Sequence, residues 1–490
     1  MKYIRSAAAL FLVLAALLSL AGCDGARQNS ELSHPAEITL PETEPETVPE
    51  TTQAPEWTPF TGTDDQYVYY YEDGRSREWE EDIIYMASSY MENYATVSRS
   101  PFRIEWPDEV EYSDRFFDPE LQQYWIDETN AMIMDIPDMT DLEIHYRIQK
   151  LVATLGSAHA SVYLPKSDYF PICFYPFRTR HGLDVRVVGL PAQYEDMLFS
   201  KLYSVNGYTL DQVIEMMRPY ISHENEAWLV GSIFAINNSS FVIWEDYLKM
   251  AGIMEPDATT VAYLMITDSN RVLKLELEPV STLDLSGYTG QLPIHANTYM
   301  YKNADTKNYW FERLPANNMI YVRINRFQEQ PDYSFLTMGS DILKDVQDNG
   351  GYIHKLVLDL RDNPGGHTFA GYHEFVELLQ RTEIGTVYVL VDFNTFSNGI
   401  IMAGTIKRMI PDSVIVGTPA GQPPNFFAGL SDGDYVMPNS GTTIRMPTSY
   451  NVSLPDYTGD TLVPDLVIYP EISQYMIGMD TILESIKNKP

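Results

Sequence analysis

The chain has 490 residues, and its 33 Lys and Arg against 68 Asp and Glu give a formal charge of −35 at pH 7. Such an acidic body is repelled by nucleic-acid phosphates, which argues against a nucleic-acid-binding protein. Hydrophobic residues make up 44% of the chain, which excludes a wholly disordered protein and, at this length, indicates several domains.

Residues 1–22 have the pattern of an export signal. Lys2 and Arg5 precede an unbroken apolar run that ends in small residues. The final tetrad, LAGC ending at Cys23, resembles the bacterial lipobox, which implies cleavage before Cys23 and acylation of that residue. We expect a protein of the bacterial cell envelope, exported and lipid-anchored to the membrane with its body outside the cytoplasm. An ordinary cleaved signal peptide and an uncleaved membrane helix are the alternatives.

Residues 23–62 are rich in Pro, Thr and Glu, as in LPETEPETVPETTQAPEWTP. A segment with so few large apolar residues cannot bury enough surface to fold, so it predicts a disordered tether. Beyond the lipidated cysteine only Cys173 remains, and no intramolecular disulfide is expected.

Helical spacing dominates residues 63–164, where Trp79, Ile83, Met86 and Tyr90 fall on one face. This pattern predicts an N-terminal helical subdomain. Its last part reads LVATLGSAHASVYLP, in which the helix should stop near the glycine and HASVYL should be extended. That arrangement would put His159 on a turn from helix to strand.

Residues 165–300 combine β-like runs (LDVRVVGL, KLYSVNG, TVAYLMIT and VLKLELEPV) with a helical pattern from Leu210 to Gly252. Within this middle α+β region, LYSVNGY followed by LDQVIEMM resembles the strand, turn and helix of PDZ domains. An ordinary hairpin turn at Asn206-Gly207 explains the same residues. A degenerate PDZ-like domain and a generic hairpin therefore both stay open.

From residue 301 to residue 490 strands alternate with helices. The expected strands are MIYVRINRF, KLVLDL, TVYVLV and SVIVG, and helices are expected over SFLTMGSDILKDVQ and from His367 and Ser397. Continuous apolar strands with crossover helices predict an α/β layer with a largely parallel sheet. Functional groups in such sheets gather at the carboxyl ends of the strands.

Two loops at that edge are chemically distinctive. LDLRDNPGG ends in Gly365 and Gly366, which permit close backbone approach, although a simple strand-to-helix turn is the plainer interpretation. VDFNTFSNG places Ser397 at the start of a helix, where the next N–H can donate to a developing oxyanion. A structural N-cap is the alternative for this serine.

Together with PDSVIVGTPAG and LVPDLVIYP, these loops resemble the tail-specific, or C-terminal processing, serine peptidases (serine peptidase family forty-one), which include the tricorn core protease. The segment LVATLGSAHASVYL resembles the helix-then-His segment of the tricorn-like branch. The resemblance implies a ClpP/crotonase-like layered catalytic core. It also implies Ser397 as the nucleophile, His159 as the general base, and the backbone N–H groups of Gly366 and Asn398 as the oxyanion hole.

The supporting acid is less well defined. The tricorn-like arrangement implies an acid near the final PD motif, where Asp460 is our first candidate and Asp456 the second. Many bacterial members instead use a Ser-Lys dyad, but the loop GTPAGQPPN after SVIVG has no Lys. Lys407 is expected to face solvent, so a Ser-His mechanism is left, with His367 as the reserve base.

The expected function is hydrolysis of protein or peptide substrates through an acyl-enzyme. No metal or organic cofactor is expected, since the sequence has no His/Cys cluster with ligand spacing and no Gly-rich phosphate loop. A catalytically inactive surface lipoprotein that binds peptides or other ligands on the same fold is the alternative. Acyl-CoA chemistry of the crotonase type is a third possibility.

Overall fold

The computed structural model describes residues 57–64, 67–97, 119–165, 167–235, 239–284, 288–289, 306–367, 371–428, 434–447 and 449–489. Cys23 and nearly all of the predicted tether lie outside the described residues. The chain divides into a short unit, Met1–Ala54, and a second unit, Pro55–Pro490, which holds every feature described below. Among the described residues, no helix is both long and apolar enough to cross a membrane.

A six-stranded sheet forms the centre of the C-terminal part, with the strand order β18-β13-β12-β11-β10-β9. All neighbouring strands are parallel except the antiparallel pair of β9 and β10. The strands are β9 (Tyr309–Leu314), β10 (Met319–Ile324), β11 (Ile353–Asp359), β12 (Ile384–Val391), β13 (Val414–Gly417) and β18 (Leu466–Val467). The predicted α/β class with a largely parallel sheet is confirmed.

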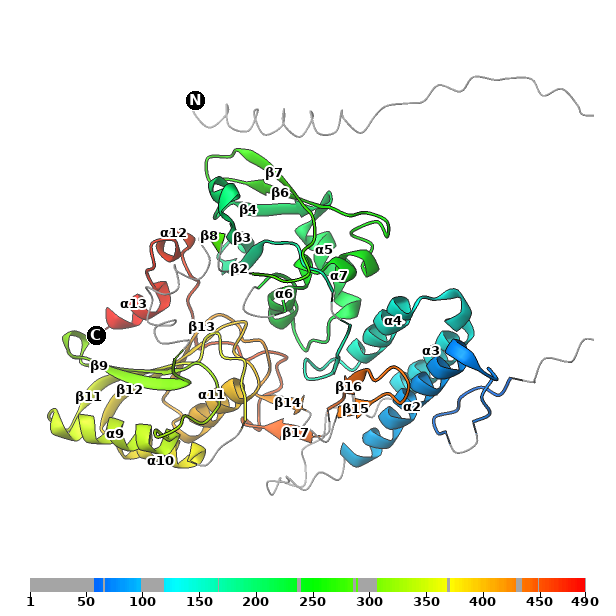
Figure 1. Ribbon diagram of the computed structural model, residues 1–490. Coiled ribbons are helices and arrows are strands. Elements are labelled where there is room, and N and C mark those ends of the chain that lie inside the picture. Colours follow the sequence, from blue (N-terminus) through cyan, green and yellow to red (C-terminus); the bar gives the residue numbers. More distant parts are fainter. Residues whose placement is uncertain are drawn as a thin grey trace, which may run out of the picture. The chain divides into compact units, whose positions relative to one another are not determined.

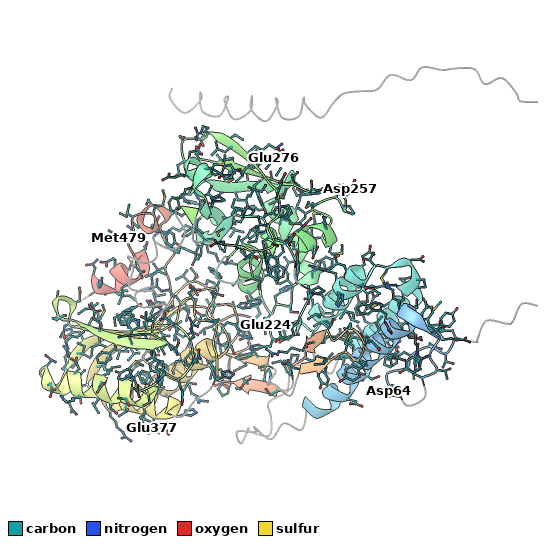
Figure 2. All side chains as sticks on the ribbon, viewed as in Figure 1. Asp64, Glu224, Asp257, Glu276, Glu377 and Met479 are labelled. Atoms are coloured by element: carbon teal, nitrogen blue, oxygen red, sulfur yellow. The ribbon has the colours of Figure 1, made fainter. Side chains whose placement is uncertain are left out.

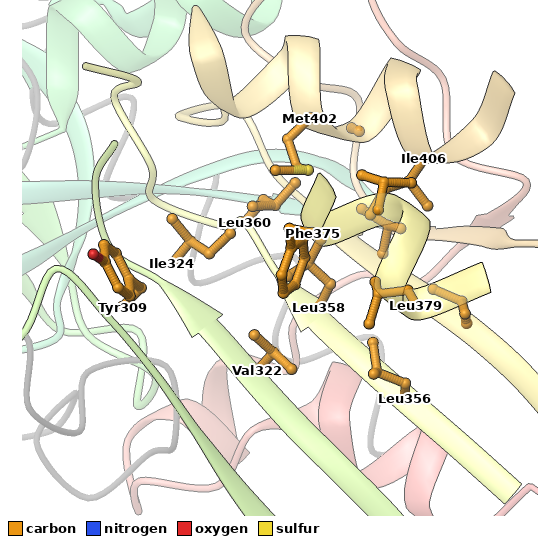
Figure 3. Close-up of a cluster of buried hydrophobic side chains, with 14 of the residues drawn as sticks. Tyr309, Val322, Ile324, Leu356, Leu358, Leu360, Phe375, Leu379, Met402 and Ile406 are labelled. Carbon is orange, nitrogen blue, oxygen red and sulfur yellow. The ribbon is translucent and has the colours of Figure 1, made fainter. Parts of the chain in front are cut away.

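Helices cover both faces of this sheet (Figure 1). One face packs against α9 (Phe335–Asp348), α10 (Tyr372–Arg381) and α11 (Asn398–Met409), and the other against α13 (Thr481–Lys487). Figure 3 shows side chains of the first interface, where Leu358 of β11, Phe375 of α10 and Met402 of α11 are fully buried. Burial on both faces explains the continuous apolar runs of these strands.

The helix expected from His367 begins only at Tyr372. Gly366 instead forms an isolated parallel bridge with Phe327, and the His367 N–H donates to the Phe327 carbonyl. Gly366 and His367 therefore make strand-like contacts with Phe327 where the helix was expected to begin.

The predicted N-terminal helices are α2 (Gly74–Val97), α3 (Pro119–Asp135) and α4 (Asp141–Ala153). The four residues of the predicted apolar face, from Trp79 to Tyr90, are all buried in one cluster. Residues from far along the chain complete that cluster, because β1 (Ser161–Val162) pairs with β16 (Thr443–Arg445), which pairs with β15 (Asp434–Val436). The segment after His159 is thereby tied to the C-terminal part of the chain.

The middle region is built on a seven-stranded sheet. Its strands are β2 (Cys173–Thr179), β3 (Gly182–Pro191), β4 (Lys201–Val205), β5 (Tyr208–Thr209), β6 (Val261–Ile266), β7 (Val272–Leu277) and β8 (Tyr288–Thr289). Its helices are α5 (Leu210–Met217), α6 (Glu226–Phe234) and α7 (Glu245–Met250). The strand, the Asn206-Gly207 turn and the following helix are present, and their assignment to a PDZ domain stays a prediction.

The helical pattern expected from Leu210 to Gly252 is broken into these three helices. Pro219 lies just after α5 in a short 3-10 turn, and a proline lacks the N–H that a continuing helix needs. The Asn225 side chain then accepts from the Trp228 N–H at 2.9 Å and caps the start of α6.

Candidate active site

Ser397 lies between β12 and α11, in a backbone conformation that is rare for a residue with a side chain. Its φ is 51° and its ψ is −121°, whereas α11 begins at the next residue. Two hydrogen bonds tie the loop that holds it to the end of β11 and the loop that follows. The Thr395 hydroxyl donates to the Leu360 carbonyl at 2.9 Å, and the Phe396 N–H donates to the Asn363 carbonyl at 2.9 Å. The neighbouring loops after β11 and β12 thus fix the serine where the two strands end.

Gly365 and Gly366 bring the loop after β11 against Ser397. A Cβ on Gly365 would lie 2.5 Å from the Ser397 Cβ, and one on Gly366 would lie 2.2 Å from the Phe327 carbonyl oxygen. Their φ values of 92° and 131° also favour glycine. Both positions therefore require glycine, because the loop backbone passes too close to Ser397 and Phe327 for a side chain to fit. A simple turn alone would not impose this requirement.

The two backbone amides predicted to bind an oxyanion are on these adjoining loops. Within the described part of the chain, the Gly366 N–H has no hydrogen-bond partner, while its carbonyl accepts from the Asn398 Nδ2 at 2.5 Å. Asn398 is the first residue of α11, where amides point out of the helix end. This contact holds the Gly366 loop to the start of α11.

His159 reaches the serine from the N-terminal part of the chain. Its Nε2 lies 3.2 Å from the Ser397 Oγ, across 238 positions of sequence. The ring stacks between Phe396, with centroids 4.6 Å apart, and Phe426 of β14 (Asn425–Ala428), with centroids 5.3 Å apart. Two flanking aromatic rings fix the plane of the imidazole so that Nε2 faces the hydroxyl.

The surroundings of His159 keep its ring neutral. Burial, followed by the charge of Arg445, lowers the pKa of His159 to about 3. Arg445 belongs to β16 and forms a two-pronged ion pair with Asp434, in which its Nε and one terminal nitrogen donate at 2.6 and 2.7 Å. A neutral imidazole can accept a proton, so at neutral pH His159 has the charge that a general base needs.

The other ring nitrogen of His159 meets a residue that sequence reasoning missed. Gln422, which is fully buried, places its Nε2 3.1 Å from the His159 Nδ1 and 2.9 Å from the Glu224 Oε1. Its Oε1 accepts from the Ser397 N–H at 2.9 Å. Gln422 belongs to the loop GTPAGQPPN, in which a lysine would have marked a Ser-Lys dyad and an uncharged glutamine gives no such signal.

Glu224 is the acid that the structure brings to this site. It lies on the loop just before α6, in the middle region of the chain (Figure 2). No motif marks it, since its loop reads SHENEA and its role depends on contacts with residues far away in sequence. The predicted acids, Asp460 and Asp456, are exposed, and within the described residues neither side chain contacts His159, Ser397 or Gln422. The backbone carbonyl of Asp460 accepts from the Asn225 Nδ2 at 2.9 Å.

The reserve candidates do not meet the serine in the described part of the chain. His367 is exposed, and its backbone N–H is used by Phe327. Lys407 is not simply turned to solvent as expected, because its Nζ donates to the Ser413 carbonyl at 2.8 Å and to Asp465 at 2.9 Å. His367, the reserve base, thus has a backbone contact with Phe327, and Lys407 is held by its two hydrogen bonds to Ser413 and Asp465.

A pocket of about 400 Å³ opens beside the histidine. Ala158 and Ala160, on either side of His159, contribute to its wall together with Trp228 and Trp244. The Trp228 ring stacks on Phe396 with centroids 4.0 Å apart, so the pocket and the serine loop share one aromatic contact. Among all the described residues, no group of three or more His, Cys, Asp or Glu could hold a metal ion.

No family model matches the sequence, and no curated protein matches it. Solved structures do match. Mature CPAF complexed with lactacystin has a TM-score of 0.54 and 11% identity, over 84% of this chain and 98% of that chain. Mature CPAF alone has a TM-score of 0.52 and 10% identity, over 82% and 94%. The photosystem II D1 C-terminal processing protease has a TM-score of 0.34 and 14% identity, over 83% and 96%.

A structure described as a putative S41 protease from Bacteroides fragilis also matches, with a TM-score of 0.33 and 13% identity, over 86% of this chain and 98% of that chain. At such low identity the match shows the fold, and it is the CPAF structures, with TM-scores above 0.5, that carry this conclusion. The chain therefore has the mixed α/β fold of CPAF over most of its length, which confirms the fold class expected from the sequence resemblance.

Proposed function

We propose that this protein is a serine peptidase that hydrolyses peptide bonds through an acyl-enzyme. The observation that carries the proposal is the 3.2 Å approach of the His159 Nε2 to the Ser397 Oγ beside the Gly366 amide. A serine hydroxyl is a weak nucleophile at neutral pH and needs a neighbouring base to take its proton during attack. The shared fold with CPAF supports the same conclusion independently of the side-chain geometry.

In the proposed reaction the Ser397 Oγ attacks the peptide carbonyl while His159 takes the hydroxyl proton at Nε2. The same nitrogen then returns that proton to the leaving amine. The Gly366 and Asn398 amides donate to the oxyanion, and loss of one such donor typically costs about 3 kcal/mol of transition-state stabilisation. Water hydrolyses the ester in the second half of the cycle, with His159 acting again as the base.

The pocket beside His159 indicates the class of side chain that the substrate presents. Its aromatic residues, Trp228 and Trp244 among them, favour a large apolar or aromatic side chain, which gains by leaving water. Peptides with Phe or Leu at the residue bound there should be cleaved with higher kcat/KM than peptides with Asp or Lys. Trp228→Ala should reduce that preference.

The direct test uses a fluorophosphonate probe, which acylates an activated serine. We expect the purified protein to be labelled, and Ser397→Ala to be neither labelled nor active on peptides. Ser397→Cys serves as a matched variant that keeps a nucleophile in place. If the folded wild-type protein is neither labelled nor active, the peptidase proposal is wrong and the ligand-binding lipoprotein is the better hypothesis.

We further propose that the protein is exported and anchored through acylated Cys23. The support is the sequence of residues 1–23, with its apolar run and its lipobox. Cells fed an alkyne-tagged fatty acid should tag the wild-type protein, and Cys23→Ala should lose both the tag and sedimentation with membranes. Equal membrane association of the two proteins would contradict lipid anchoring.

A further inference from the structure

The side-chain amide of Gln422 makes three contacts that depend on which of its ends carries the hydrogens. Its Oε1 accepts from the Ser397 N–H at 2.9 Å, and its Nε2 donates to the Glu224 Oε1 at 2.9 Å. The third contact joins Nε2 to the His159 Nδ1 at 3.1 Å. The Ser397 backbone N–H can only donate, which fixes the role of the first contact, and in the second contact the Glu224 Oε1 accepts.

These fixed partners leave one orientation for the amide. Turning it over would set its NH2 group against the Ser397 N–H and its oxygen against the Glu224 carboxylate. Both hydrogen bonds would then become repulsive contacts. Because the Gln422 side chain is fully buried, water could not supply the lost hydrogen bonds. The Gln422 Nε2 therefore faces His159 with a hydrogen, so the His159 Nδ1 must be an acceptor.

An imidazole whose Nδ1 accepts carries its proton on Nε2 when it is neutral. In that tautomer the Nε2 proton points at the Ser397 Oγ, and the lone pair that a general base needs is on the wrong nitrogen. We propose that Gln422, held by Glu224, is a positioning residue that keeps His159 in a resting tautomer, and that catalysis requires the Gln422 amide to turn over. This inference rests on the proposed peptidase function and specifies how the same site is restrained.

The change between the two states is balanced in protons. The Nε2 proton is released to solvent water and Nδ1 takes one proton from solvent water, so the imidazole stays neutral. Gln422 then accepts from the Nδ1–H through Oε1, and its bonds to the Ser397 amide and to Glu224 are lost. Because both bonds hold the resting state, weakening the contact with Glu224 should favour the competent state.

Long-range 1H–15N spectra of the imidazole test the resting tautomer directly. They distinguish the protonated ring nitrogen from the one with a lone pair, and His159→Gln assigns the signals. We expect the purified full chain to show His159 protonated on Nε2. A wild-type spectrum with the proton on Nδ1 would overturn the proposal, whatever the activity of the protein.

An exchange of the two side chains provides the second test. The double variant Gln422→Glu with Glu224→Gln puts the carboxylate beside the His159 Nδ1 and the amide behind it. The His159 proton should move to Nδ1, and kcat/KM should rise at least about tenfold, because the competent tautomer changes from a minor to the main form. Glu224→Gln alone should give a smaller rise, and Glu226→Gln, two residues away and exposed, should give none.

The outcomes separate this inference from the peptidase proposal. Fluorophosphonate labelling of Ser397 tests the peptidase, whereas the tautomer signal and the exchange variant test the restraint. A labelled wild-type enzyme whose activity falls in a folded exchange variant contradicts the restraint alone. If the exchange variant does not fold, the wild-type spectrum and the activity of Glu224→Gln still test whether Gln422 restrains the His159 tautomer.

Discussion

Phe396 stacks on the imidazole of His159, with ring centroids 4.6 Å apart and planes inclined by 21°. The residue before the candidate nucleophile thus also positions the candidate base. Trp228 lies on the other face of Phe396 at 4.0 Å and comes from α6 in the middle region. One aromatic stack therefore joins the middle region, the serine loop and the N-terminal segment that carries the histidine.

Replacing Phe396 should reduce activity more than stability. Phe396→Leu keeps an apolar side chain but removes the flat surface that orients His159, and a small misplacement of a catalytic group can cost about a hundredfold in rate. We expect kcat/KM to fall by about tenfold to a hundredfold. Fluorophosphonate labelling should slow in parallel.

Phe375→Leu is the matched control, because Phe375 is buried in the core between the sheet and its helices. That variant should lower the melting temperature and leave kcat/KM unchanged. Equal kinetics in the two folded variants would remove the stack from any role in positioning His159.

Gly365 should not tolerate even a methyl group. Gly365→Ala would place its Cβ 2.5 Å from the Ser397 Cβ, so the serine loop must shift. Gly351→Ala is the control, since Gly351 also has a positive φ of 76° but nothing within 4 Å of an added Cβ. Each variant should lose about 1 kcal/mol or more of unfolding free energy from backbone strain.

Only Gly365→Ala should also lose labelling of Ser397 and peptide hydrolysis. The measurement is the rate of fluorophosphonate labelling together with urea denaturation of both variants. If the two variants keep the same labelling rate as the wild type, the close approach of the two loops has no catalytic consequence.

The sheet and its two loops could be predicted because their signals are local. The strand KLVLDL is apolar throughout, as a doubly covered parallel strand must be, and the NPGG turn after it marks the close approach to Ser397. His159 was predicted from the resemblance of its segment to a family, while its approach to Ser397 depends on the pairing of β1 with β16. No local sequence pattern predicts that β1 pairs with β16.

Glu224 and Gln422 could not be predicted for a physical reason. An acid near a catalytic histidine is recognised by its position in space, and Glu224 is on a loop whose sequence resembles any solvated turn. Asp460 was predicted because the family resemblance implies an acid near the final PD motif, and the structure shows its side chain exposed. Gln422 is uncharged, so a search for titratable partners passes over it.

The burial of His159 should appear in the pH dependence of stability. Its folded pKa is about 3, and an unfolded histidine titrates near pH 6.5. Between these values the unfolded chain binds the extra proton, so this residue's contribution makes stability fall as pH decreases below about 6.5. His159→Gln removes the titrating group and hence this part of the slope.

Urea denaturation at pH 7 and pH 5 measures the effect. The wild type should lose up to about 2 kcal/mol more unfolding free energy over this interval than His159→Gln does. Identical losses in the two proteins would mean that His159 titrates normally in the folded state. In the wild-type enzyme, kcat/KM should likewise show no loss from His159 protonation until the pH approaches 3.

A buried ion network connects the end of β11 to the start of α13, and its removal should destabilise the catalytic layer. Arg361 donates through its Nε and one terminal nitrogen to Asp359 at 3.0 and 2.6 Å, and through both terminal nitrogens to Asp480 at 2.9 and 2.6 Å. Burial alone would raise the pKa of Asp359, but Arg361 and Arg323 outweigh it and hold that pKa below its ordinary value. Asp359 is therefore a buried anion that depends on these cations.

Arg361→Met removes the main partner of a fully buried carboxylate, and breaking such a pair typically costs about 3–5 kcal/mol of unfolding free energy. We expect a loss at the lower end of this range, because Arg323 stays within 3.5 Å of Asp359. Arg381→Met is the control, since Arg381 is 71% exposed in its pair with Glu377 and its loss should change stability by no more than about 0.5 kcal/mol. Urea denaturation of the two variants side by side measures the difference, and similar midpoints would show that the network contributes no more than a surface ion pair.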